Sequence, residues 1–265
     1  MKKRIWVVLL LFLGIVLGCS KNSNDDPKQS AVDKTANLKA TGSSANDILS
    51  NTNFDKLQIE IAYVDGFRPT TSAMTDFVNF LETHSFKQNI ELIYKELPSP
   101  NEAKLTLDEI VELEDKNRTI YNDGSTLAIY IYFADAPSED DKEEEDLVTL
   151  GAVYLNTSMV IYEDTIRTLA SKSNLISVGD VETATLNHEF GHLLGLVDLG
   201  STPVNGHEDV DSENHCNVEG CLMRAELQFG AGMKKMLEKR ASKGFADAPG
   251  LDPECILDLQ TNGGR

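Results

Sequence analysis

The sequence predicts a mixed α/β fold, and three observations support this prediction. Segments with strand and helix periods alternate over the first half of the chain. The densest β-branched and aromatic run, at 127–133, is typical of a central strand. Residues 46–265 are numerous enough to form one well-buried domain. Strands and helices that alternate in this way pack as a sheet covered by helices.

Three further segments have the pattern of strands. Residues 56–64 alternate apolar and polar side chains, which is the period of a half-buried strand, and Asp65-Gly66 then breaks the pattern. Residues 90–94 form a second apolar run. Residues 150–162 are predicted to form a strand-turn-strand with Asn156-Thr157-Ser158 at its centre.

The predicted helices lie between and after these strands. Residues 71–84 place apolar side chains at helical spacing. Residues 106–121 begin with a sequence that resembles a capping box, in which Thr106 and Glu109 are three apart. Towards the end of the chain, we expect a helix at 230–239 and a short final helix around 255–259.

Residues 188–198 contain the most informative motif, His-Glu-Phe-Gly-His-Leu-Leu-Gly-Leu-Val-Asp. His188 and His192 are four residues apart, so on a helix their imidazoles project from one face and suit a single zinc ion. Glu189 can take a proton from a water on the open side of that metal. Gly195 can end the helix because it tolerates a positive φ. The pattern predicts a zinc hydrolase site.

The segment His215-Cys216-Asn217-Val218-Glu219-Gly220-Cys221-Leu222-Met223 follows this motif. At this point the chain resembles the metzincin clan of metalloproteases, whose H-E-x-x-H-x-x-G motif is followed by a methionine turn. The local H-C-x4-C-x-M pattern resembles the archaemetzincin branch, and the chain is also similar to bacterial lipoproteins described as membrane metalloproteases. Two features depart from the archaemetzincin pattern: residues 199–214 interrupt it, and the C-x-x-C pair that ends it is missing.

The resemblance implies a zincin fold (α+β) with a mixed, mostly parallel sheet, a zinc-binding active-site helix and a Met-turn. Met223 would lie beneath the metal as a packing residue. The strand at Gly151-Ala152-Val153 would border the cleft and offer its backbone to an extended peptide substrate.

The third zinc ligand is ambiguous in the sequence. His215 lies eight residues before Met223, as in the archaemetzincin pattern, and is the preferred assignment. Asp198 follows His192 by six residues, which is the usual metzincin spacing, and His207 lies inside the insertion. Three histidines with an open fourth position are a common catalytic arrangement.

Residues 1–18 are predicted to be a secretory signal peptide, because a basic start precedes an apolar run at 5–17 that is short for a membrane span. Val16-Leu17-Gly18-Cys19 resembles a lipobox, which implies that Cys19 carries a lipid. We expect residues 19–45 to form a disordered tether and residues 46–265 the metalloprotease domain. The protein is therefore expected to be exported and anchored by its lipid to the outer membrane or cell surface.

The charge excludes some partners. The formal net charge of −19 becomes −22 when Lys2, Lys3 and Arg4 leave with the signal peptide. So acidic a protein is a poor ligand for nucleic acid or anionic lipid, and it needs the lipid anchor to stay on a membrane. We expect a monomer.

Three cysteines remain in the folded part. Cys216 and Cys221 can close a short disulfide loop in an exported chain, and the pairing of Cys255 is open. We expect no structural zinc site with so few thiols.

Two acidic segments are candidate calcium sites. Residues 139–146 lack the glycine and the alternating spacing of a calcium loop, so they are interpreted as a solvated loop. Asp209, Asp211 and Glu213 lie closer to the zinc motif, but calcium is not expected there either.

These patterns predict a zinc-dependent endopeptidase at the bacterial surface or periplasmic face, with one catalytic zinc and Glu189 as general base. Its substrate would be a protein or peptide. The alternative is a non-catalytic surface-binding lipoprotein that uses the same fold to bind a metal or a partner. Glu189 argues against this alternative, because a metal store needs no general base.

Overall fold

A computed structural model describes residues 33–142, 147–245 and 247–265 of the chain, and Asp33–Arg265 forms one compact unit. Its main sheet has five strands in the order β2-β1-β3-β5-β4. Neighbouring strands are parallel except for β4, which runs antiparallel to β5 at one edge. The strands are β1 Lys56–Val64, β2 Asn89–Leu97, β3 Thr126–Ala134, β4 Gly151–Leu155 and β5 Ser158–Tyr162. The predicted mixed, mostly parallel sheet is confirmed.

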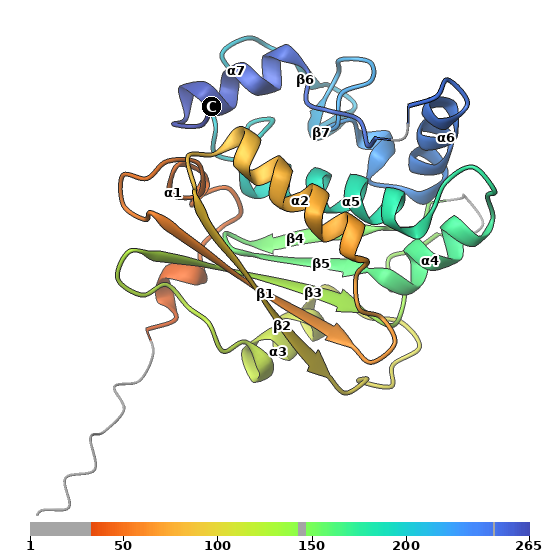
Figure 1. The fold of residues 1–265 in the computed structure, drawn as a ribbon, viewed down its shortest axis with the longest axis horizontal. Coiled ribbons are helices and arrows are strands. Elements are labelled where there is room, and N and C mark those ends of the chain that lie inside the picture. The colour runs from red at the N-terminus through yellow and green to blue at the C-terminus, as the bar shows by residue number, and fades with distance from the viewer. Residues whose placement is uncertain (1–32, 143–146, 246) are drawn as a thin grey trace, which may run out of the picture. The chain divides into compact units, whose positions relative to one another are not determined.

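Helices cover both faces of this sheet (Figure 1). Helix α3 lies on the face opposite to α2 and α5. A two-stranded hairpin, β6 Glu208–Asp209 with β7 Ser212–Cys216, lies outside the main sheet. The helices are α1 Ala45–Leu49, α2 Thr71–His84, α3 Leu107–Asn117, α4 Glu163–Ser171, α5 Val178–Leu193, α6 Gly230–Ala241 and α7 Pro253–Thr261.

Each face of the sheet has its own apolar core, because successive side chains of a strand point to opposite faces. Ile59 and Ile61 of β1 belong to the larger core, which includes Phe190 of α5 and Phe77 of α2. Ala62 of β1 belongs to the smaller core under α3. Strand β1 is therefore covered on both faces, and the larger core holds helix α5 on the sheet.

Most predicted elements lie where the sequence placed them, with differences at their ends. Helix α2 spans the predicted 71–84, and the capping box of α3 at Thr106 and Glu109 is present. Helix α3 ends at Asn117 instead of 121, because Arg118 adopts an extended backbone and its side chain is buried against Glu114. Helix α4 was not predicted, although its buried residues recur at helical spacing.

The predicted tether at 19–45 is wrong for its last part. The side chain of Asn37 is fully buried and donates hydrogen bonds to the Ala128 carbonyl and to Thr157 Oγ1. Asn156 reaches back to accept from the Lys39 backbone N–H. These contacts order the chain from Asp33, so the compact unit begins before residue 46.

The predicted signal peptide, Cys19 and the first part of the tether lie outside the described residues. In the part of the chain that the structure describes, no helix has the length and apolar character to span a membrane.

Candidate active site

Helix α5 carries the histidine motif through the middle of the molecule (Figure 1). It begins with a capping box in which Ser177 accepts from the Asp180 backbone N–H and Asp180 accepts in return from the Ser177 backbone N–H. All but one of its residues after Val178 are buried, because the sheet, α2, α4 and α6 surround it. It ends at Leu193, and Gly195 has the expected positive φ of 78°. The motif is therefore held rigidly.

Three imidazoles converge at this helix. His188 and His192 come from α5 and His215 comes from β7. Their ring centroids are 5.0 Å (His188 to His192), 5.1 Å (His192 to His215) and 5.5 Å (His188 to His215) apart. One ring nitrogen of each lies within 4.8 Å of the others. The structure thus brings together the three residues that the sequence analysis preferred as ligands.

Backbone carbonyls orient two of these rings. His188 Nδ1 donates to the Leu222 carbonyl at 2.8 Å, and His215 Nδ1 donates to the Glu213 carbonyl at 2.9 Å. Each ring then has an unprotonated Nε2. Among the described residues, His188 Nε2, His215 Nε2 and His192 Nδ1 are buried without a hydrogen-bond partner.

Burial keeps these imidazoles neutral. It lowers the pKa of His188 to about 4, the Leu222 carbonyl opposes this shift, and neighbouring His215 adds to it. Burial also lowers the pKa of His192 and His215. Neutral imidazole is the form that ligates a metal. Three convergent neutral rings with buried, unpartnered nitrogens fit a zinc ion and leave a fourth position open.

Glu189 lies beside this cluster on the same helix. Its side chain is buried, and its Oε1 has no partner among the described residues. Burial raises the pKa of Glu189 to about 8. Gly151, the first residue of β4, makes room for it: a Cβ at position 151 would lie 2.6 Å from Glu189 Cγ. The edge strand of the sheet therefore begins next to this carboxyl group.

Met223 lies against helix α5. The fully buried Met223 packs against Gly191, where a Cβ would lie 2.3 Å from Met223 Sδ. The Met223 carbonyl accepts from the Cys216 backbone N–H at 2.7 Å. Segment 215–223 is thus joined to α5 through the Leu222 carbonyl, and the backbone hydrogen bond between Cys216 and Met223 holds the two ends of the segment together. The sequence analysis named Gly151 only as part of the strand at 151–153 and gave Gly191 no role of its own, because the contacts of these glycines with Glu189 and Met223 form across the fold.

The other candidates for the third ligand lie elsewhere. Asp198 is exposed at a positive φ of 65°, in the turn after α5, and is not part of the histidine cluster. His207 is buried in a different group of side chains. The predicted disulfide is not formed: Cys216 and Cys221 are free thiols, and Cys221 Sγ lies 3.7 Å from Cys255 Sγ.

Comparison with known proteins supports the fold. No family pattern and no curated sequence matches the chain. Among solved structures, archaemetzincin from Methanopyrus kandleri superposes with a TM-score of 0.50 at 14% identity, over 78% of this chain and 96% of that one. The chain has an archaemetzincin-like fold. Metalloproteinase-II from Bacteroides fragilis gives a TM-score of 0.43 at 13% identity, over 86% of this chain and 57% of that one.

Proposed function

We propose that the protein is a zinc-dependent endopeptidase of the metzincin type. The observation that carries this proposal is the convergence of three neutral, buried imidazoles on one point beside the unpartnered carboxyl group of Glu189. The archaemetzincin-like fold supports it. A protein that only stores metal or binds a partner needs the three imidazoles, but it has no use for a buried carboxyl group next to them.

Each residue of the site has a distinct part in peptide hydrolysis. His188, His192 and His215 would hold the zinc. When bound there, zinc would supply Lewis-acid polarisation of the scissile carbonyl and a more acidic water. Glu189 would take the proton from the attacking water and pass it to the leaving amine. Gly191 and Met223 would position the ligands by fixing segment 215–223 under α5.

Strand β4 suits an extended substrate. It is the terminal strand of the five-stranded sheet, so only one of its two sides pairs with β5. An extended peptide binds such an edge by main-chain hydrogen bonds. Because Gly151 of β4 adjoins Glu189, a peptide on this edge would pass the general base. The substrate is therefore proposed to be a protein or peptide in extended conformation.

We further propose that the enzyme acts outside the cytoplasm as a lipoprotein. The basic start, the apolar run at 5–17 and Cys19 support this placement. The lipid would hold an otherwise strongly acidic protein at the membrane.

The variant Glu189→Gln tests the proposed chemistry. It keeps the shape of the side chain but cannot accept the proton, so peptidase activity should fall by roughly a hundredfold to ten-thousandfold. Zinc content should not change, because Glu189 is not a ligand. Asp211→Asn, which removes an exposed acid on the hairpin β6–β7, is the matched control and should keep its activity. Full activity of Glu189→Gln would refute the proposed mechanism.

A further inference from the structure

Helices α2 and α5 enclose a small pocket, which we call the α2–α5 pocket. From α5 it is lined by Asp180, Thr183 and Asn187, whose spacing of three and four residues places them on one helix face. Side chains between residues 76 and 84 of α2 and the segment 247–250 supply the other walls. The volume of about 290 Å³ lies at the lower end of the range for sites of small ligands. None of the three active-site histidines lines this pocket.

The pocket contains a buried hydrogen-bond acceptor without a donor. The side chain of Asn187 is only 7% exposed, and its Oδ1 has no hydrogen-bond partner among the described residues. Thr183, one turn earlier on the same face, is buried as well. Leaving a buried acceptor unpaired is costly, so native structures rarely keep one without a ligand or an ordered water. The pocket is therefore suited to a ligand that donates hydrogen bonds.

Three carboxyl groups give the pocket a negative charge. Asp76 of α2, Asp180 of α5 and Asp247 all line it, and no lysine or arginine does. In the part of the chain that the structure describes, none of the three forms an ion pair. Asp180 uses Oδ2 for both of its hydrogen bonds to Ser177, so Oδ1 is left for a ligand. Together these carboxylates favour a positively charged ligand.

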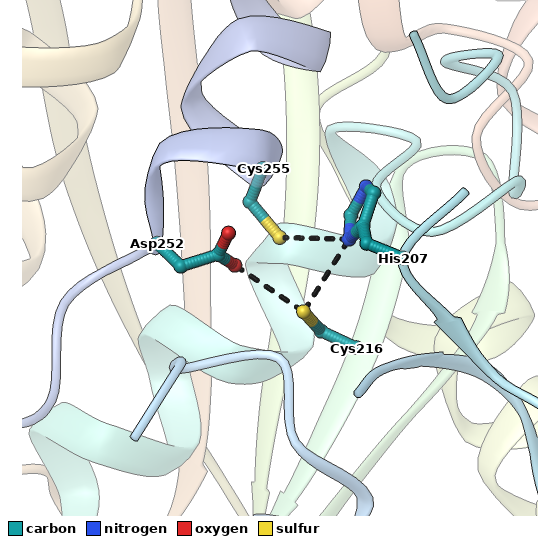
Figure 2. Close-up of side chains that lie close together, drawn as sticks. All are labelled: His207, Cys216, Asp252 and Cys255. Atoms are coloured by element: carbon teal, nitrogen blue, oxygen red, sulfur yellow. Dashed lines mark hydrogen bonds between the residues drawn. The ribbon is translucent and has the colours of Figure 1, made fainter. Parts of the chain in front are cut away.

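This ligand is an organic cation rather than a metal ion. The two groups of side chains that converge closely enough to bind a metal among the described residues include none of the pocket's carboxyl groups. One is the histidine cluster of the active site. The other, drawn in Figure 2, shares no residue with the pocket and consists of His207, Cys216, Asp252 and Cys255.

An aromatic wall favours a planar cation. Phe80 and His84 of α2 both line the pocket, and their ring centroids are 4.8 Å apart in an edge-to-face arrangement. Burial lowers the pKa of His84, so this ring adds no positive charge at neutral pH. A guanidinium group is planar, stacks on aromatic rings and offers five N–H donors, whereas an ammonium group is a compact and strongly hydrated charge. The aromatic wall and the several separate acceptors therefore match a guanidinium group best.

We propose that the α2–α5 pocket binds a guanidinium group, carried by a small guanidine or by an arginine side chain. Asn187 Oδ1 would accept one N–H inside the pocket, the carboxylates would accept others, and Phe80 would pack against the plane of the cation. This site goes beyond the proposed peptidase activity, because none of its residues takes part in the hydrolysis.

The pocket is connected to the histidine cluster by short routes. Asn187 directly precedes His188 in α5. Gly250 lines the pocket, its carbonyl accepts from the Leu222 backbone N–H at 2.8 Å, and the Leu222 carbonyl orients His188. A ligand that joins α2, α5 and the segment 247–250 would therefore steady His188. This connection rests on the proposed zinc site, whereas binding of the guanidinium group does not.

Calorimetric titration of the full chain with butylguanidinium, which has one charge and no bond that a peptidase cleaves, tests the site. We expect saturable binding of one molecule per chain. Butylammonium should bind at least about tenfold more weakly, because it makes fewer charged hydrogen bonds. Butylurea, which has nearly the same shape but no charge, should not bind.

Variants assign the binding to the pocket. Asn187→Leu should lower the affinity at least about tenfold, because a hydrogen bond to a charged group is lost. It should not destabilise the fold, since Asn187 Oδ1 has no hydrogen bond to lose. Asp76→Asn, at an exposed position, should lower the affinity by about twofold to fivefold. Asp211→Asn removes an exposed acid outside the pocket and should leave the affinity unchanged.

A blocked pentapeptide with one arginine between glycines distinguishes the two sources of the group. It is titrated into the Glu189→Gln variant, which should not cleave it, in competition with bound butylguanidinium. Displacement at a lower concentration than that needed for free butylguanidinium assigns the pocket to an arginine side chain of a polypeptide. Displacement only at a higher concentration assigns it to a small guanidine.

Zinc tests the connection to His188 separately. Butylguanidinium should bind about fivefold or more tightly to the zinc-loaded chain than to the zinc-free chain, which is the lower end of typical coupling between sites. His188→Ala should remove this difference and keep the binding, so a failure of the proposed zinc site does not remove the signal of the pocket. Equal affinity with and without zinc would refute the connection. The site itself would be overturned by a lack of saturable butylguanidinium binding, by equal binding of butylurea, or by unchanged affinity in Asn187→Leu.

Discussion

Replacing Gly191 by alanine probes the contact between helix α5 and Met223. A Cβ at this position would lie 2.3 Å from Met223 Sδ and 3.0 Å from Met223 Cε, so Met223 has to move. Segment 215–223 includes His215, and Leu222 orients His188. Movement of Met223 therefore disturbs both the packing and the positions of His188 and His215.

The magnitude follows from two opposing effects. Alanine in place of glycine inside a helix normally stabilises by about 0.5–1 kcal/mol. Overpacking a buried site costs about 1–3 kcal/mol. Gly191→Ala should therefore lower the free energy of unfolding by about 0.5–2 kcal/mol. It should also weaken zinc binding, because His188 and His215 are no longer held in register.

A double-mutant cycle measured by urea unfolding isolates this contact. Met223→Ala alone should destabilise by about 2–5 kcal/mol, because it leaves a cavity. In that background the clash is gone, so Gly191→Ala should now stabilise by about 0.5–1 kcal/mol. The sign of the effect thus reverses with the residue at 223. Equal destabilisation in both backgrounds, or no destabilisation in either, would refute the assigned contact.

Three further changes test other parts of the structure. Gly151→Ala places a Cβ 2.6 Å from Glu189 Cγ, so kcat should fall by about a hundredfold with zinc content unchanged; equal activity would remove Gly151 from the site. Burial, with Glu182 nearby, raises the pKa of Glu163 from 4.5 to about 9, so the stability of the unaltered protein should fall as pH rises through this range. Glu163→Gln should flatten that fall in unfolding free energy, and an unchanged slope would contradict the assignment. Cys19→Ala should move the expressed protein out of the detergent-soluble membrane fraction, whereas continued retention would mean that another segment or a partner anchors it.

Local periodicity was sufficient to predict most of the fold and two of the three histidines that converge at α5. The spacing of His188 and His192 on a helix determines their common face, whatever the helix packs against. The apolar patterns of β1 and α2 likewise gave their positions directly. Such features depend on residues that are neighbours along the chain.

Features that depend on distant contacts could be predicted only partly or not at all. The choice of His215 over Asp198 depends on how residues 199–214 fold, and the hairpin β6–β7 has no strong strand period. Asn37 is ordered by hydrogen bonds to β3 and to the turn before β5, which its polar surroundings in sequence do not reveal. His207 and Cys255 are 48 residues apart, so no local motif relates them.

The most direct test of the central claim is an anomalous difference map at the zinc edge from crystals of the full chain grown with zinc. We predict a peak about 2.0–2.1 Å from one ring nitrogen each of His188, His192 and His215, with Glu189 beside it but not bound. A histidine cluster without a peak, or a zinc ion held by Asp198 in place of His215, would contradict this account.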